Sequence, residues 1–145
     1  MSARSKIVDG LVTLFENIDG ATPYNKYINP NNIRNRQIFW DEVNDYPFIC
    51  VYAGQETREY QASGFKWGHL LVYIKIYTNS ETPQEDLELI IEDIEYVLDE
   101  NNEFTYDNVR NKQAQDIRIN QITTDEGVLH PIGVGEILIQ IRYDL

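Results

Sequence analysis

The residues that could carry out chemistry are few and lie far apart in the sequence. The chain has two histidines, His69 and His130, and one cysteine, Cys50. Neither histidine lies in an HExxH or His-x-His motif, so neither has the spacing that places two imidazoles on one metal ion. Cys50 has apolar neighbours on both sides, which is typical of a small core residue rather than a nucleophile. A lone cysteine also forms no internal disulfide, and we expect no enzyme, no metal site and no cofactor.

An acidic turn and a glycine pair are the remaining candidates for ligand binding. Asp125 and Glu126 lie side by side before Gly127. They could bind a cation, or they could simply keep a loop solvated. Gly133 and Gly135 lack the third glycine and the strand-before-helix setting of a phosphate-binding loop, so we interpret them as turn residues.

Apolar residues at three-to-four spacing predict two amphipathic helices. The first covers about four turns up to Gly20, with Ser5 as a possible cap. The second begins after Thr82, the predicted cap, and has Pro83 at its first position. Its apolar stripe would pack on a sheet.

Alternating apolar residues predict the strands of that sheet. The strongest alternation covers 66–77 and 137–143, with further strands at 47–52 and 117–122. Between the first helix and these strands, residues 21–45 form a long polar connection of the kind that is usually functional or disordered. We predict one α+β domain, residues 1–145, with a mainly antiparallel sheet of about four to five strands and two helices packed on one side.

The negative charge is concentrated in one part of the chain. Of 24 acidic residues, eleven fall between Ile76 and Val109, where there is no Lys or Arg; the other 13 acids nearly balance the 12 basic residues, for a remainder of −1. Unpaired carboxylates in this number must face water or a partner. Direct binding of a nucleic-acid backbone by this surface is disfavoured.

No segment is apolar and long enough to cross a membrane, and no apolar core of a signal peptide follows the N-terminus. We therefore expect the protein to remain where it is made and not to contact a membrane. The chain has ten tyrosines and two tryptophans, several of them in polar segments. Such aromatics either pack beneath the long connection or serve protein interfaces, where tyrosine is enriched.

The C-terminal run from Asp116 to Ile137 resembles the terminal hairpin of bacteriophage tail terminator (tail completion) proteins. The preceding features are similar as well: a short N-terminal helix, a strand introduced by Tyr46-Pro47-Phe48, and an acidic helix opened by Pro83. The resemblance implies a structural virion protein at the tail-neck junction, made in the host cytoplasm. It also implies a homo-oligomeric ring, expected to be a hexamer, that caps the tail tube, ends its polymerisation and presents the head-binding surface.

The resemblance implies partners and contact residues. The partners would be the tail tube protein, a head connector or neck protein and, as a further candidate, a sheath protein. Contacts with a neighbouring subunit or the tube are expected in the long connection and in the turn before the last strand: Tyr24, Tyr27, Arg34, Arg36, Trp40, Thr124, Asp125, Glu126, Gly127 and His130. If the acidic helix faces the channel, its carboxylates would repel passing DNA: Glu88, Glu92, Glu95 and Asp99.

Two other functions are compatible with the same residues. The protein could occupy another neck position, as a head-completion or head-tail joining protein, because these share its size and α/β character. The regularly spaced carboxylates could instead imitate DNA phosphates and inhibit a nucleic-acid-binding enzyme. The nearly neutral remainder of the chain argues against a mimic.

Overall fold

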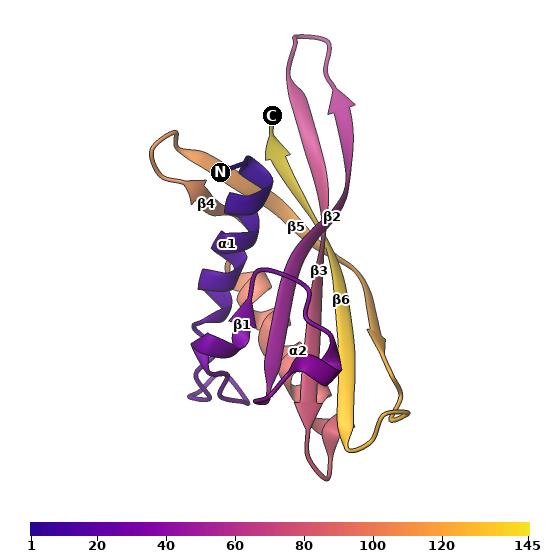
Figure 1. Ribbon diagram of the computed structural model, residues 1–145. Helices are drawn as coiled ribbons and strands as arrows, with labels where there is room; N and C mark the ends of the chain where they lie inside the picture. Colours follow the sequence, from indigo (N-terminus) through magenta and orange to yellow (C-terminus); the bar gives the residue numbers. More distant parts are fainter.

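Two helices cover one face of a six-stranded sheet in the computed structural model, which describes residues 1–145 (Figure 1). The strand order is β1-β2-β3-β6-β5-β4. The elements are α1 (Ala3–Phe15), β1 (Ile33–Arg34), β2 (Phe48–Tyr60), β3 (Lys66–Asn79), α2 (Pro83–Glu100), β4 (Phe104–Asp107), β5 (Lys112–Thr124) and β6 (Ile132–Asp144), with two 3-10 turns, η1 (Pro30–Asn32) and η2 (Trp40–Glu42).

The predicted α+β class is confirmed, but the predicted sheet of four to five strands is wrong. The sheet has six strands and is mixed, because β1 pairs with β2 in parallel while all other pairs are antiparallel. The two strands that were not predicted, β1 and β4, are short and lie at the two edges of the sheet. β1 has only two residues and therefore no alternation, whereas β4 alternates only at Phe104 and Tyr106, over the shortest run that such a pattern can mark.

Strands β3 and β6 form the centre of the sheet and pair along their whole lengths, from Trp67 opposite Asp144 to Asn79 opposite Ile132. Successive side chains of a strand point to opposite faces. The helix face, the face that α1 and α2 cover, therefore receives every second residue of these strands. The core on it joins both helices to the sheet through Ile7, Leu11, Phe15, Leu87, Ile90, Ile94, Leu70, Val72, Ile74, Ile76, Ile137, Ile139 and Ile141, all at most 1% exposed.

The helix ends differ from those predicted. Ser2, not Ser5, caps α1, because its Oγ accepts a hydrogen bond of 3.1 Å from the backbone N–H of Ser5. Thr82 precedes α2 but makes no side-chain cap hydrogen bond. Pro83 does open this helix, as predicted.

The opposite face of the sheet is covered in part by the segment between β1 and β2. Val43, Phe48, Cys50 and Tyr77 form a second, smaller core there. The Tyr77 hydroxyl donates a hydrogen bond of 2.6 Å to the carbonyl of Ile38, which fixes the segment on the sheet. Cys50 is fully buried, and burial raises the pKa of its thiol, as suits the predicted core residue.

Gly133 and Gly135 lie in β6 and not in a turn, which corrects our interpretation of them. A Cβ on Gly133 would lie 2.5 Å from Thr78 Oγ1 and 3.0 Å from both Leu87 Cδ1 and the Pro83 carbonyl. The missing side chains therefore allow the first turn of α2 to approach the sheet closely. No helix is long and apolar enough to cross a membrane.

Candidate interaction surfaces

The turn between β5 and β6 is organised by Asp125. Its carboxylate accepts hydrogen bonds from the backbone N–H groups of Gly127 at 3.4 Å, Leu129 at 3.1 Å and Val134 at 3.3 Å. The carboxylate thus fixes the conformation of the turn. No group of three or more His, Cys, Asp or Glu side chains is placed to hold a metal ion, at this turn or elsewhere.

The tip of this turn is the part that faces outward. Glu126 and His130 are exposed, and Val128 between them is 80% exposed. The backbone is left-handed at Glu126 (φ 56°) and Gly127 (φ 87°), which makes the reversal tight. Sequence reasoning missed Val128, although a valine flanked by turn residues and charges is the available signal for an exposed apolar contact.

The turn is joined to the connection between β3 and α2. The Ser80 backbone N–H donates to the Pro131 carbonyl at 3.1 Å, and His130 Nε2 lies 3.3 Å from the Glu81 carbonyl. Both connections lie at the lower end of the molecule in Figure 1. Tyr27 belongs to the same end, since it lines a small hollow with Asn79 at the end of β3.

The two predicted contact tyrosines have different environments. Tyr27 is 60% exposed. Tyr24 is half-buried and packs edge-on against Tyr96 of α2, with ring centroids 5.6 Å apart, and burial is the main cause that raises its pKa. Tyr24 therefore contributes to the packing of the long connection, whereas Tyr27 is available to a partner.

Arg34, Arg36 and Trp40 lie on the segment that leads from β1 across the sheet. Both arginines are exposed, line one polar hollow and form no ion pair within the chain. Trp40 is 43% exposed, and its neighbour Phe39, which was not among the predicted contact residues, is 59% exposed. Arginine and large aromatic residues are enriched at protein interfaces, so exposed residues of both kinds on one short segment suit a contact surface.

The four acids predicted to face a channel lie on one stripe of α2. Glu88, Glu92 and Asp99 are exposed, Glu95 is half-buried, and none of them forms an ion pair with Lys or Arg. Burial, followed by the charges of Asp99, Glu92 and Glu88, raises the pKa of Glu95. The stripe is therefore a surface of uncompensated negative charge.

Not all of the eleven acids face water. Asp93 is 1% exposed and Asp107 is 8% exposed. Asp107 accepts a hydrogen bond of 2.8 Å from Lys6 Nζ of α1. Counting charges along the sequence could not separate these two structural carboxylates from the exposed ones.

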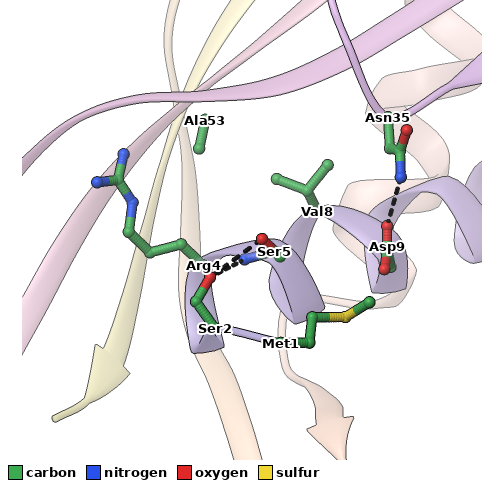
Figure 2. A pocket seen from close by; sticks show the side chains of 8 residues that line it. All are labelled: Met1, Ser2, Arg4, Ser5, Val8, Asp9, Asn35 and Ala53. Atoms are coloured by element: carbon green, nitrogen blue, oxygen red, sulfur yellow. Dashed lines mark hydrogen bonds between the residues drawn. The ribbon is translucent and has the colours of Figure 1, made fainter.

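A shallow, open hollow lies where the start of α1 meets β2 (Figure 2). The Arg4 guanidinium donates to the carbonyl of Gly54 on β2, and Asn35 Nδ2 donates to Asp9 Oδ1 at 2.9 Å. The lining is mostly polar: Met1, Ser2, Arg4, Ser5, Val8, Asp9, Asn35 and Ala53. It lacks the enclosed apolar walls of a small-molecule site.

The hairpin of β2 and β3 extends beyond the helices as an arm (Figure 1). Residues 57–66 are all exposed, including Tyr60 at 68% and Phe65 at 59%. On the opposite side of β3, the Arg142 guanidinium lies 4.5 Å from the ring centre of Trp67. The arm was not among the predicted contact regions, because its residues 55–60 are polar and show no apolar periodicity.

The sequence matches the family model described as bacteriophage tail tube terminator protein over residues 1–145. It is 32% identical over 153 residues to the tail tube terminator protein p142 of Escherichia phage T5, in an alignment that covers 99% of this chain and 94% of that protein. Both findings confirm the resemblance that was drawn from the C-terminal hairpin. The chain therefore belongs to the family of bacteriophage tail tube terminator proteins.

Proposed function

We propose that this structural tail protein assembles as a ring on the end of the tail tube, ends tube polymerisation and presents a surface to the head connector or neck protein. The match to tail tube terminators over the whole chain carries this proposal. It favours the terminator position over another neck position. The ring is expected to be a hexamer at the tail-neck junction.

The contacts with the tube or a neighbouring subunit would come from exposed side chains in the segment after β1 and in the turn between β5 and β6. Arg34, Arg36 and Trp40 offer two cations without an ion pair and one exposed aromatic ring on the same segment. The tip of the turn between β5 and β6, with Val128 and His130, offers an apolar contact held on a fixed backbone. The acidic stripe of α2 would face the channel, where its carboxylates repel DNA and keep it from adhering.

The test is the length of tail tubes assembled with and without this protein. Tubes grown in vitro from the tail tube protein of the same phage should stay short when the protein is present, and electron microscopy should show added density at one end. Tubes that grow to the same length, without end density at saturating protein, would contradict the proposal.

A matched pair of variants tests the proposed contacts. Arg34→Ala with Arg36→Ala should weaken end binding by roughly tenfold or more, as expected when charged interface anchors are removed. Arg110→Ala is the control, because Arg110 is also exposed and without an ion pair but lies on the turn between β4 and β5. The double variant removes two charges and the control removes one, so a loss of binding free energy only about twice that of the control would show that only net charge matters.

A further inference from the structure

Two strands of the sheet have main-chain edges that the chain leaves half covered. On β2, the short strand β1 pairs with Ile49 and Cys50 only. On β5, the short strand β4 pairs only with the region from Lys112 to Ala114. Each edge strand is thus covered over its first part and continues without a partner on its outer side.

Each uncovered edge begins just after a backbone carbonyl that accepts a hydrogen bond from a side chain of the same chain. Arg4 donates to the Gly54 carbonyl of β2 (its guanidinium appears in Figure 2), and Asn102 Nδ2 donates to the Ile117 carbonyl of β5 at 3.0 Å. Beyond these points, no side chain of the protein hydrogen-bonds the main chain of Gln55–Tyr60 or of Arg118–Thr124. We call these segments the free β2 edge and the free β5 edge.

Unpaired strand edges are templates for another strand, and proteins usually block them with Pro or Lys. Neither free edge contains a Pro or a Lys. One bulge lies at Gly54 and Gln55, where the free β2 edge begins, and another lies at Asn120 within the free β5 edge. A bulge restricts which strand can pair. The edges are therefore suited to one specific partner strand rather than to unlimited growth.

The two edges are compatible with each other in charge. Copies of a chain with a net charge of −12 repel each other wherever acidic surfaces meet. In the free β2 edge Arg58 lies 3.0 Å from Glu56, and Glu59 leaves this edge with a net charge of −1. The free β5 edge carries one charge, that of Arg118, which lies 3.1 Å from Asp116 just before the edge. Contact between these two edges brings no large like charges together.

The side chains on the helix face of both edges are compatible as well. Ile119 and Ile122 pair with Ile139 and Ile137 of β6, so they point to the helix face, and they are 37% and 43% exposed. Tyr60 pairs with Lys66 and lies on the same face of the sheet. In a sheet that continues from one copy to the next, Tyr60 and these isoleucines would become cross-strand neighbours and lose water.

We infer that copies of this chain join head to tail by pairing the free β5 edge of one copy with the free β2 edge of the next. This inference rests on the proposed ring, because the two edges differ and such a contact is heterologous, the kind that closes rings. The pairing is antiparallel, since β2 and β5 run in opposite directions within the sheet. The two free segments lie at opposite ends of the sheet, because β2 and β5 run in opposite directions and each is free in its later part. Neighbouring copies must therefore be displaced along the strands. Strands that are tilted to the ring axis allow this displacement in a closed ring.

Cysteine cross-linking tests this pairing. Thr57 and Gln121 are exposed, lie near the middle of the two free edges and point to the face opposite the helices, because they pair with His69 and Leu138. The variant that carries both Thr57→Cys and Gln121→Cys, bound to tail tubes and treated with a short bis-maleimide, should give a ladder of cross-linked species. Cys50 is fully buried and can stay in place.

Mixing experiments fix the direction of the contact. A mixture of the two single variants should stop at cross-linked dimers, and each single variant alone should give none. Gln121→Cys combined with Val109→Cys is the control, since Val109 is 95% exposed on a turn outside both edges. Single variants that cross-link to themselves, or tube-bound protein without a ladder, would overturn the edge pairing while leaving the proposed function intact.

The edge pairing and the terminator function can also be separated if the pairing holds and the function fails. A ladder formed by a protein that neither binds tubes nor limits their length would support the edge pairing and refute the terminator function. Asn120→Pro adds a second measurement, because Asn120 is the bulge residue that has no partner on β6. It should reduce the ladder by at least tenfold with little change in the unfolding transition.

Discussion

The carboxylate of Asp93 on α2 accepts a hydrogen bond of 2.7 Å from the backbone N–H of Asn25 in the long N-terminal connection, and a second of 3.0 Å from Lys26. Burial raises the pKa of Asp93, and the two backbone hydrogen bonds oppose that increase. A carboxylate that the charge pattern placed on a solvated face is in fact the attachment point of the connection. Through it, α2 holds the segment that carries exposed Tyr27.

Asp93→Ala should lower the free energy of unfolding by about 3 kcal/mol, because it removes two charge-assisted hydrogen bonds and leaves their donors poorly satisfied. Urea unfolding at neutral pH measures the change. Glu92→Gln is the control, because the Glu92 side chain, next to Asp93 in the sequence, accepts only one hydrogen bond, of 3.1 Å from the exposed Asn25 side-chain amide. This substitution should lower the free energy of unfolding by less than about 0.5 kcal/mol. Similar values for the two variants would show that Asp93 does not hold the connection.

The pair of Lys6 and Asp107 should make stability depend on pH in the acidic range. The hydrogen bond from Lys6, followed by those from Arg110 and Val109, lowers the pKa of Asp107 below its usual value of 3.8. A lowered pKa in the folded state stabilises the protein above pH 3.8, and this contribution is lost as the pH falls through the lowered pKa. Asp107→Asn should therefore be less stable than the unmodified protein at neutral pH and nearly equal to it in strong acid.

Urea midpoints of both proteins across this pH range measure the effect. Asp116→Asn is the control, because its partner Arg118 is 69% exposed and such surface pairs contribute little at any pH. A difference for Asp107→Asn that stays constant with pH would exclude the ionised pair as its cause.

Gly133→Ala should lower the free energy of unfolding by about 2 kcal/mol, because the new methyl group would clash with backbone atoms that can shift only if the packing of α2 on the sheet is disturbed. Its Cβ would lie 3.0 Å from the Pro83 carbonyl and 2.5 Å from Thr78 Oγ1, which itself donates to that carbonyl. Gly135→Ala is the matched control: its nearest neighbour is the flexible end of Leu87, at 3.2 Å. Thermal unfolding compares the two, and an equal loss would refute the close approach of α2 as the reason for Gly133.

The long periodic elements were predictable because one face of each is buried. The alternation from Leu70 to Ile76 and from Ile137 to Tyr143 located the two central strands, and the apolar stripe after Pro83 located α2. β1 could not be found in this way, since it has two residues and is a strand only because β2 lies beside it. The glycines of β6 were mistaken for a turn because the residue they accommodate, Leu87, is far away in the sequence.

The environments of the surface residues also depend on residues that are distant in the sequence, so local patterns could not predict them. Tyr24 and Tyr27 stand in the same polar segment, and only the position of Tyr96 decides that one packs and the other is exposed. The free edges on β2 and β5 have no sequence signature, since they depend on how far β1 and β4 extend. Composition could indicate a binding protein, but the surfaces that bind follow from strand register.

The last prediction concerns the acidic stripe of α2. Its carboxylates form no ion pairs with Lys or Arg and repel one another, which lowers the free energy of unfolding. Glu88 and Glu92, Glu92 and Glu95, and Glu95 and Asp99 are like-charged pairs at helical spacing. Removing these repulsions by changing Glu88, Glu92 and Glu95 to Gln and Asp99 to Asn should raise the free energy of unfolding by about 1 kcal/mol. The variant thus folds at least as well as the original, and any functional defect reports on charge alone.

If the stripe lines the channel, phage that carry this variant should eject DNA several-fold more slowly, because phosphates would no longer be repelled by the wall. The control removes the same number of charges elsewhere, by changing the exposed acids Glu16, Asp19, Glu81 and Glu103 to their amides. Ejection kinetics measured by fluorescence of released DNA would compare the two. Slowing confined to the α2 variant would support a channel position, whereas unchanged ejection in both would exclude it and leave the stripe as a solvated helix face.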